Sequence, residues 1–491
     1  MNYKMIVKIV GKIMILMALL MLLPLLVSII YQEDIKYKLA FLIPIVALLG
    51  IGSLLSFRKL KNNKYGVKEG IIIVCLTWLL MALVGCLPFI ISGDIPNFFD
   101  AFFEISSGFT TTGASIIDLN VTNLSNSIHF WRSFSHWIGG MGVLVFILAI
   151  IPESNDGSSI HILRAESPGP QVGKLVSKMK ATSRILYLIY LCLTVLEIIF
   201  LTLGPDKDMT FFKSIIYTMG TAGTGGFAYD ATCLQYYTPY TQYVVAIFMI
   251  IFSINFTVFY LVLIGNIKEV VKNEEVKVFL SIIIVSVGLI TANLLLTQDN
   301  NANTLGFEEA FRQSFFQVSS IISTTGYLTV DFSLWPTFSK TIIIILMVLG
   351  GCAGSTAGGL KISRVIMLFK SVIRKIKISI SPRKVETIKM NGKSIEDETI
   401  NGVQTYFIIY IVVLVICAIL ISIDGHSLET NFTASLSCIS NVGPRFGVAP
   451  VGTFDVFSNF SKFILSIEMI AGRLELLPIL ALFSKNLWCK N

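Results

Sequence analysis

The chain has 491 residues, of which 54% are hydrophobic and 14% are charged, and its mean hydropathy is +0.77. Soluble domains carry about 25% charged residues, so the composition excludes a soluble globular protein and predicts an integral membrane protein. The net charge of +8 falls mainly in short connections between apolar runs, a distribution that argues against a nucleic-acid-binding surface.

Ten apolar stretches are long enough to cross a bilayer as helices, which takes roughly 20 residues. In chain order they cover 6–30, 37–57, 70–92, 127–151, 182–204, 239–265, 276–296, 338–368, 402–423 and 459–484. The first is longer than the apolar part of a signal peptide, and no A-x-A-like cleavage site precedes "YQEDIKYK". We therefore expect a retained helix rather than a cleaved leader.

The charge of the connections alternates along the chain. The segment 361–393 holds ten Lys or Arg. Another basic connection contains Arg58, Lys59, Lys61, Lys64 and Lys68. The connections "ISGDIPNFFD", "LGPDKD" and "TQDNNANTLGFEE" are acidic or nearly neutral. Since basic loops stay on the cytoplasmic side, we expect both termini in the cytoplasm.

Four shorter, half-apolar segments lie between neighbouring stretches. They read "FFDAFFEISSGFTTTGAS", "FFKSIIYTMGTAGTGGFA", "FRQSFFQVSSIISTTGYL" and "ETNFTASLSCISNVGPRF". Aligned on Gly113, Gly225, Gly326 and Gly443, they recur after 112, 101 and 117 residues. We therefore predict an all-α membrane protein with two N-terminal transmembrane helices, followed by four parallel repeats of helix, pore helix, filter and helix around a central pore.

This interpretation divides the chain into five parts. They are 1–68, the two extra helices; 69–155, the first repeat; 156–268, the second repeat with the cytoplasmic loop before it; 269–372, the third repeat; and 373–491, the basic linker and the fourth repeat.

The polar breaks that end the four segments have the composition of a cation site built from backbone. Non-helical backbone at membrane depth is tolerated only where protein or a water-filled cavity satisfies its polar groups. A ring of carbonyl oxygens that replaces the hydration shell of a cation meets this condition, and glycine permits the backbone angles it needs. The C-terminal ends of the short helices add partial negative charge. Ordinary extracellular loops with capping glycines are the alternative, and the fourfold recurrence argues against them.

The four segments resemble the pore loops of the Trk/Ktr/HKT superfamily of potassium transporters. The extra N-terminal helices, "GGCAGSTAGGLK" and "AGRLE" are similar to those of the membrane subunits of bacterial Trk systems. The resemblance implies potassium uptake through a channel-like pore in the bacterial cytoplasmic membrane. It also implies a homodimer with one pore per subunit and a cytosolic, nucleotide-binding, TrkA-like regulatory ring. Ktr-type subunits, which generally lack the first two helices, are the nearest alternative.

The resemblance assigns residues to a potassium filter by alignment on the glycines. They are Thr111, Thr112, Gly113 and Ala114; Gly223, Thr224, Gly225 and Gly226; Thr324, Thr325, Gly326 and Tyr327; and Asn441, Val442, Gly443 and Pro444. K+ is then the transported ion, and we expect no organic cofactor. Because Asn441 and Val442 replace both hydroxyl positions, we expect an approximately fourfold ring with weaker discrimination against sodium.

A glycine-rich stretch interrupts the spanning sequence of the third repeat. Such turns can cradle phosphate, but this one lacks the G-K-[ST] ending and follows no strand. In the family the matching loop lies just below the filter and obstructs the pore, so we expect 350–360 to form the gate. Its candidate residues are Gly350, Gly351, Gly354, Ser355, Thr356, Gly358 and Gly359.

Arg473 is assigned to the same gate. A charge at the centre of a membrane helix costs about 2.5 to 3.5 kcal/mol on insertion scales. An ion pair with Glu468 or Glu475 would satisfy the guanidinium, whereas a position just inside the filter would let it slow cations and contact the gate. The sequence leaves both interpretations open.

Two histidines precede the apolar part of the stretch 127–151. His129 and His136 are seven residues apart and suggest a metal site, but no third ligand is apparent. Packing of Trp131 and Trp137 at the membrane interface is the favoured interpretation.

Two acidic residues lie on the first short helix. Asp100 and Glu104 are placed to raise the local cation concentration at the pore mouth. Solvation, or hydrogen bonding to the start of the helix, is the alternative.

Three classes of function remain to be weighed. The sequence has no H-E-x-x-H, no G-x-S-x-G and no carboxylate pair at membrane depth, so an enzyme is the least favoured. The eight cysteines form no C-x-x-C pair, and we expect neither zinc nor a disulfide framework. Parallel repeats favour a channel over a coupled transporter, although symport with sodium or protons stays open. The basic segments 164–180, 268–277 and 361–393 are expected to meet anionic lipid or the regulatory ring.

Overall fold

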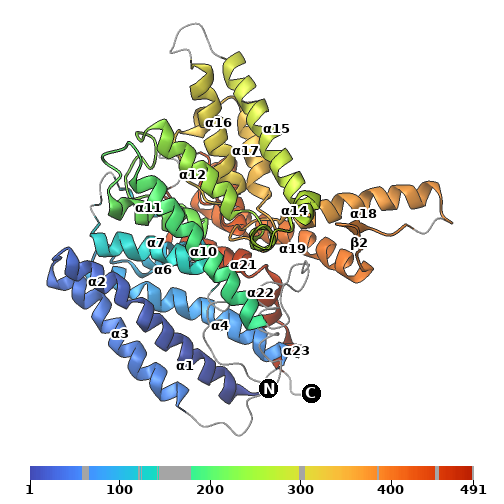
Figure 1. The fold of residues 1–491 in the computed structure, drawn as a ribbon. Helices are drawn as coiled ribbons and strands as arrows, with labels where there is room; N and C mark the ends of the chain where they lie inside the picture. The colour runs from blue at the N-terminus through green and yellow to red at the C-terminus, as the bar shows by residue number, and fades with distance from the viewer. Residues whose placement is uncertain are drawn as a thin grey trace.

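The computed structural model describes residues 1–57, 66–119, 122, 124–140, 142, 179–297, 305–383, 386–447 and 453–488. This part of the chain is helical apart from one two-stranded hairpin, which confirms the predicted fold class (Figure 1). The basic residues Arg58, Lys59, Lys61 and Lys64 and most of the segment 164–180 lie outside it.

The N-terminal helices pack as a tight layer. They are α1 (Tyr3–Leu20), α2 (Leu22–Ile30), α3 (Ile35–Ser56), α4 (Val67–Gly85) and α5 (Leu87–Ser92). Helices α1 and α3 touch through glycines, since a Cβ added to Gly11 would lie 2.9 Å from the carbonyl oxygen of Gly52. Small residues at such crossings let membrane helices approach closely, and the two extra N-terminal helices thereby pack against each other.

The four predicted short helices are all present. They are α6 (Phe98–Thr110), α11 (Phe211–Gly223), α16 (Phe307–Ile322) and α20 (Leu428–Ser440). Three of them begin at capping side chains, because Asn97, Thr210 and Ser427 each accept a hydrogen bond from a backbone N–H in the first turn. The fourth begins after Gly306 with two glutamates in its first turn, which favour a helix N-terminus.

The long helix before each of the last three short helices is continuous. These are α10 (Met179–Thr202), α15 (Glu274–Leu296) and α19 (Asp397–Ile421). By length and composition, six described helices can cross a membrane, or seven if one bent pair is counted as a span. Not all of the ten predicted crossings are therefore formed by single uninterrupted helices among the described residues.

The stretches after the second, third and fourth short helices are all broken, although only the third was predicted to be interrupted. The stretch 239–265 is bent by 92° between α12 (Pro239–Phe252) and α13 (Phe256–Leu263). The stretch 338–368 is split into α17 (Thr337–Val348) and α18 (Ile362–Ile380), and 459–484 into α21 (Asn459–Arg473) and α22 (Leu477–Leu482). The break in 338–368 falls at the predicted glycine-rich stretch. The breaks in 239–265 and 459–484 were not predicted, because apolar residues surround them in the sequence. After the first short helix, α7 (Asn126–Gly140) is described, but most of the predicted continuation to 151 lies outside the described residues.

The remaining elements are short. They are α14 (Ile267–Lys272), α23 (Lys485–Trp488), the 3-10 turns η1 (Phe332–Leu334) and η2 (Ser422–Asp424), and the antiparallel strands β1 (Lys389–Met390) and β2 (Lys393–Ser394). The proposed boundary at 155/156 lies outside the described residues, and that at 372/373 falls inside α18. The division into repeats stays a proposal.

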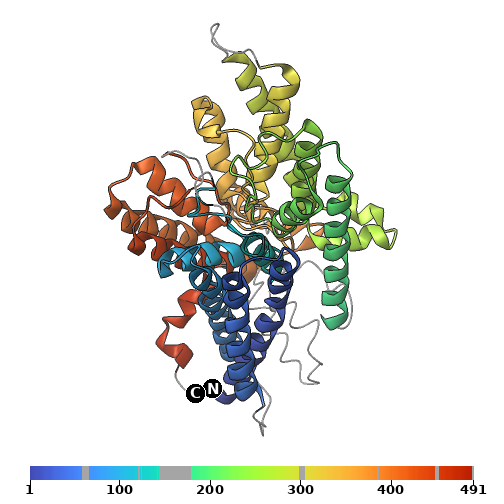
Figure 2. The same ribbon diagram turned by 90° about the vertical axis from the view of Figure 1, so that its left-hand side faces the viewer.

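Four groups of helices surround a common centre, and they are called the first to fourth units below, according to whether they contain α6, α11, α16 or α20. In Figure 2 the segments coloured blue to cyan, green, yellow to orange and red lie around the loops that follow the short helices. Helix α18 projects away from this body (Figure 1). Leu487 of α23 belongs to the same buried cluster as Ile6 of α1, so the two ends of the described chain lie on one side of the molecule.

Candidate ion pathway

The four short helices end in the same unusual backbone conformation. Each is followed, directly or after one further residue, by a non-glycine residue with a left-handed φ of 54° to 58°. These residues are Thr111, Thr224, Thr324 and Asn441. A β-branched residue rarely adopts this conformation, and such strain concentrates at functional sites. The four helix ends are therefore built alike despite their different sequences.

The hydrogen bonds at these ends fix the register of the four segments. Each left-handed residue donates its N–H to the carbonyl three residues earlier at 3.0 to 3.3 Å, and the next residue donates to the carbonyl five residues earlier at 2.8 to 2.9 Å. A glycine with φ between 77° and 102° follows in every case. These glycines are Gly113, Gly226, Gly326 and Gly443.

The predicted alignment of the second segment is therefore shifted by one residue. Gly226, not Gly225, occupies the position of Gly113, and Gly223 is the last residue of α11. The sequence "GTGG" contains two adjacent glycines, and composition cannot tell which of them takes the positive φ. The bond from the N–H of Gly225 to the carbonyl of Gly220 decides it.

The four segments 111–113, 224–226, 324–326 and 441–443, called ring segments below, touch one another in a closed cycle. A Cβ added to each positive-φ glycine would collide with, or press against, a carbonyl oxygen of the next segment. The pairs are Gly113 with Gly225, Gly226 with Thr325, Gly326 with Val442, and Gly443 with Thr112. All four oxygens belong to the residue after the left-handed one, so equivalent carbonyls line one ring.

The chemistry of this ring suits a cation. Carbonyl oxygens carry partial negative charge, and the C-terminal ends of four helices converge behind them. Glycine is required because any side chain there would displace a carbonyl of the neighbouring segment.

Hydroxyl and amide groups support the ring from behind. The Thr112 hydroxyl lies 2.8 Å from that of Thr110, and the Thr325 hydroxyl lies 2.7 Å from that of Ser323. The Asn441 side chain donates to the Thr112 hydroxyl at 2.9 Å. The fourth segment thus lacks a hydroxyl, but its amide holds the first segment in place.

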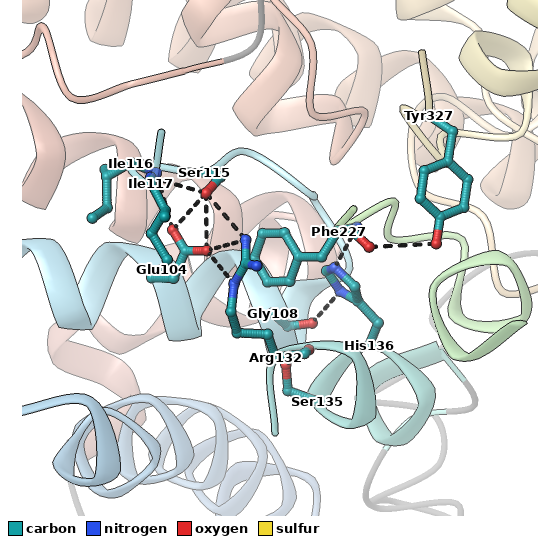
Figure 3. A network of polar contacts seen from close by, with 10 residues as sticks. All are labelled: Glu104, Gly108, Ser115, Ile116, Ile117, Arg132, Ser135, His136, Phe227 and Tyr327. Atoms are coloured by element: carbon teal, nitrogen blue, oxygen red, sulfur yellow. Dashed lines mark hydrogen bonds and ion pairs between the residues drawn. The ribbon is translucent and has the colours of Figure 1, made fainter. Parts of the chain in front are cut away.

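His136 joins the end of α6 to the residue that follows the second ring segment (Figure 3). Its Nδ1 lies 2.7 Å from the carbonyl oxygen of Gly108, and its Nε2 accepts a bond of 3.3 Å from the N–H of Phe227. These partners assign a neutral ring protonated at Nδ1. Tyr327 of the third segment donates its hydroxyl to the carbonyls of Tyr217, at 2.9 Å, and Phe227.

Glu104 is not at the pore mouth, contrary to our expectation. Its carboxylate is fully buried and pairs with Arg132 at 2.8 Å, and it accepts bonds from the Ser115 hydroxyl and the Ile116 N–H (Figure 3). Asp100 pairs with Lys462 at 2.6 Å. Both acids therefore tie elements together instead of presenting unpaired negative charge.

Removing one member of the Glu104–Arg132 pair should destabilise the protein strongly. We expect Glu104→Ala to lower the free energy of unfolding by about 3 to 5 kcal/mol, because it leaves a buried cation without its anion. The measurement is thermal unfolding of the detergent-solubilised protein. The control is Glu308→Ala, which breaks an exposed pair with Arg312 and should cost at most about 1 kcal/mol. Equal melting temperatures for the two variants would contradict the structural role.

His129, His136 and Trp131 of α7 are buried in the core, and Trp137 is half-buried. His129 packs against the ring of Tyr229 with 4.4 Å between centroids, and Trp131 is fully buried and donates to the carbonyl of Gly85. Within the described ranges, no group of three or more His, Cys, Asp or Glu is arranged to hold a metal ion. Because Trp131 is buried in the protein, it does not lie at the membrane interface, where we expected it.

The loop that follows the second ring segment is held by Asp230. Its carboxylate accepts bonds from Lys213 at 2.8 Å and from the hydroxyls of Tyr217 and Tyr237 at 3.0 and 2.7 Å. Burial and the adjacent carboxylate raise the pKa of Tyr237, so this hydroxyl stays a donor at neutral pH.

The predicted gate forms a closed loop, residues 349–361, called the intramembrane loop below. Its neck is closed by bonds of 3.0 Å from the Gly350 N–H to the Leu360 carbonyl and 3.2 Å from the Ile362 N–H to the Gly351 carbonyl. Gly359, with φ of 65°, packs against Gly350.

The tip of the loop contacts the second, third and fourth units. Thr356 bonds through its N–H and its hydroxyl to the carbonyl of Phe252, and the Gly354 carbonyl accepts from the Phe256 N–H. Ser355 closes a turn onto Cys352. The remaining contacts are made by Gly358, which donates to the Thr324 hydroxyl at 2.7 Å and packs against the carbonyl of Ser440.

Arg473 lies between the loop and the first unit. Its guanidinium donates to the carbonyl of Thr356 at 2.9 Å and to those of Gly139 and Gly140. Glu475, which the sequence offered as a partner, forms an ion pair with Arg364 of α18. Arg473 thus contacts the predicted gate directly.

Two residues that organise this region have no such role in the predictions from sequence: His136 was considered only for metal binding, and Glu275 not at all. Asn441 was assigned to the filter, but its amide bond to Thr112 was not predicted. Their roles depend on backbone partners far away in the sequence, which motif searches do not reveal. A polar residue inside an apolar helix is the one signal that could have singled out His136.

Comparison with known proteins agrees with this geometry. Residues 38–490 match the TrkH family model, described as a cation transport protein. The "Trk system potassium uptake protein TrkH" of Vibrio parahaemolyticus is 32% identical over 99% of this chain and all of its own length. That of Escherichia coli is also 32% identical over 99% of this chain and all of its own length, and TrkG of Escherichia coli is 31% identical over 96% of both chains.

The crystal structure of the potassium transporter TrkH from Vibrio parahaemolyticus has the same fold. It superposes with a TM-score of 0.87 and 29% identity, covering all of both chains. The chain therefore belongs to the TrkH family of cation transport proteins.

Proposed function

We propose that this chain takes up potassium ions across the bacterial cytoplasmic membrane through a gated, cation-selective pore. The observation that carries the proposal is the closed ring of four equivalent carbonyl oxygens at the C-terminal ends of four short helices. Such a ring replaces the hydration shell of a potassium ion. The relatives with matching sequences are potassium uptake proteins by name.

We assign the filter to the ring segments. The ion-binding residues are then Thr111, Thr112, Gly113, Thr224, Gly225, Gly226, Thr324, Thr325, Gly326, Asn441, Val442 and Gly443, with Gly223 at the end of the second short helix. The transported ion is the only ligand of this site in the proposal, and catalysis has no part in it.

The intramembrane loop and Arg473 form the gate in this proposal. Together they contact all four units beneath the ring: the loop reaches Phe252, Thr324 and Ser440, and Arg473 reaches Gly139. An element that touches four units arranged around one axis must lie across that axis. The positive charge of Arg473 adds an electrostatic barrier to cations.

The proposed assembly has several partners outside this chain. Both termini face the cytoplasm, in keeping with the shared cluster of Ile6 and Leu487. The multi-pass chain forms a homodimer in the lipid bilayer, and a cytosolic nucleotide-binding subunit regulates it. The basic residues of α18 and the linker after it are the surface offered to that subunit or to anionic lipid.

Coupling to sodium or protons is the second candidate, and two buried carboxyl groups favour it. Glu197 of α10 is fully buried, and Thr221 of α11 is the polar side chain beside its carboxyl group. Glu468 of α21 is also buried and accepts a bond of 2.6 Å from the Ser435 hydroxyl. Carboxyl groups at membrane depth are typical of coupled transporters.

The deciding experiment measures ion flux through the purified protein in liposomes. Potassium, rubidium, sodium and lithium are supplied in turn, with and without an opposing gradient of sodium or protons. The proposal predicts potassium and rubidium flux that follows the potassium gradient and exceeds sodium flux. Equal sodium and potassium flux would remove the claim of selectivity, and potassium movement against its gradient would establish coupling.

Asn441 offers a specific test of the fourth ring segment. We expect Asn441→Ala to reduce the ratio of potassium to sodium flux, because it removes the bond to the Thr112 hydroxyl and another of 3.0 Å to the Met469 carbonyl. Two hydrogen bonds are worth about 1 to 3 kcal/mol together. The control is Asn431→Ala on the same short helix, whose amide bonds to the His426 carbonyl away from the ring. If both variants keep the wild-type ratio, the amide does not shape the filter.

A further inference from the structure

A buried carboxylate outside the ring holds both ends of the intramembrane loop. Glu275, the second residue of α15, is 1% exposed. Its Oε1 accepts bonds of 2.7 Å from the N–H of Ala353 and 3.0 Å from that of Ser363. Ala353 lies early in the loop, and Ser363 belongs to the first turn of α18. One oxygen atom therefore links the loop to the helix that follows it.

This contact supplies what the start of α18 lacks. The first N–H groups of a helix have no partner within the helix, and the capping residue Lys361 provides no side-chain bond. The Glu275 carboxylate takes over as the cap from another helix. Hydrogen bonds from backbone N–H groups to a carboxylate are about twice as strong as neutral ones, and the positive end of the helix favours the negative charge.

The neighbouring residue Glu274 is bound to a hairpin in the basic linker. The N–H of Glu274 donates to the Asn391 side chain at 2.8 Å, and the N–H of Asn391 donates to the Glu274 carboxylate at 3.2 Å. Lys370 pairs with the same carboxylate and donates to the Lys389 carbonyl at 2.7 Å. The hairpin and the start of α15 are thus joined by bonds in both directions.

The hairpin is a defined structure rather than a loose linker. Asn391 and Gly392 have φ of 51° and 78°, as expected for a two-residue Asn-Gly turn. Met390 is buried against Met367 of α18 and Val403 of α19. A displacement of the hairpin would therefore move residues 274 and 275 together.

We propose that Glu275 is a positioning residue that keeps the intramembrane loop closed. We further propose that a displacement of the hairpin 389–394 on the cytoplasmic side moves Glu275 and so opens the loop. The inference rests on the proposed function, because it takes the loop to be the gate. It goes further by naming the contacts that fix the closed loop and the surface from which they are controlled.

The test compares variants of the full-length protein in liposomes without any partner, with rubidium uptake as the signal. Glu275→Ala should raise uptake about tenfold or more, since loss of bonds to a charged acceptor is worth at least about 1.4 kcal/mol. Glu275→Gln keeps a carbonyl oxygen in place of Oε1 and should restore most of the wild-type closure. Asn391→Ala should raise uptake to a smaller extent, whereas Asn401→Ala, at an exposed position of α19, should leave it unchanged.

A second signal reports the loop itself. Cys352 lies in the loop and is fully buried. A water-soluble thiol reagent, with labelling read by mass spectrometry for each cysteine, should modify Cys352 faster in Glu275→Ala and in Asn391→Ala than in the wild type. The rate at Cys233, a half-buried cysteine between α11 and α12 and outside the candidate spans, should stay constant and serves as the internal standard.

Two outcomes separate the inference from the function on which it rests. A variant without residues 351–358 is measured in parallel. The deletion variant conducts rubidium if the loop is the gate. If Glu275→Ala and Glu275→Gln then both keep the wild-type rubidium uptake and the wild-type protection of Cys352, the positioning role of Glu275 is refuted while the role of the loop as gate stands. If neither the loop-deletion variant nor the wild type conducts rubidium, the proposed function itself fails. Misfolding of Glu275→Ala alone would show as lost thermal stability, and Asn391→Ala then decides the question.

Discussion

We expect the deletion of residues 351–358 to raise potassium flux through the resting protein by about tenfold or more, the equivalent of at least about 1.4 kcal/mol of barrier. The chain can be rejoined without strain in the flanking helices, because a Cβ on Gly350 would lie 3.0 Å from the Cα of Gly359. The deletion removes the Thr356 carbonyl that binds Arg473 and the Gly358 N–H that binds the Thr324 hydroxyl. These contacts connect the loop to α21 and to the third ring segment.

A matched variant distinguishes the bulk of the loop from its contacts. In it, residues 351–358 are replaced by glycine and serine at the same length, which keeps the chain across the axis but removes the side chains and fixed turns. We expect its flux to fall between those of the wild type and the deletion. Unchanged flux in the deletion variant, in protein with wild-type thermal stability, would show that the loop does not obstruct the pathway. The measurement is rubidium uptake into liposomes at low and high potassium gradients.

The four short helices and the turns after them could be predicted from the sequence because the same local pattern recurs four times. Each copy needs a short helix, a turn and a glycine, and each therefore shows an apolar run followed by small and polar residues, as around Gly113 and Gly326. The exact register could not be predicted where glycines are adjacent. At Gly225 and Gly226, only the hydrogen bond of Gly225 to Gly220 selects the residue with positive φ.

The sequence was least informative about partners of buried charges. Glu104 looked like a residue of the pore mouth because its position on the helix is visible in the sequence, whereas its partner Arg132 belongs to the next helix and is brought to it by folding. The same limit applies to Arg473: its carbonyl acceptors lie in the first and third units, more than a hundred residues away. Backbone acceptors leave no trace in a sequence, so contacts of this kind can be found only in the folded chain.

Replacing Gly226 by alanine should nearly abolish selective potassium flux. The new methyl group would collide with the carbonyl oxygen of Thr325, one of the four that line the ring, and φ of 77° is itself unfavourable for alanine by about 1 to 2 kcal/mol. Relief of the collision requires movement of backbone, since no flexible side chain is involved. We expect potassium flux to fall to about one tenth of wild type or less, and the ratio of potassium to sodium flux to fall with it.

The control for this variant is Gly288→Ala in α15, where a Cβ meets no atom within 4 Å and the helix tolerates alanine well. Gly226→Ala is also combined with the deletion of residues 351–358. If the ring selects ions and the loop only gates them, the combined variant must remain unselective however open its gate is. Restored potassium selectivity in the combined variant, or wild-type flux in Gly226→Ala alone, would place the selecting element outside the ring. Loss of selectivity in both, with normal flux in the control, would separate the two functions: the carbonyl ring discriminates between ions, and the intramembrane loop sets how many of them pass.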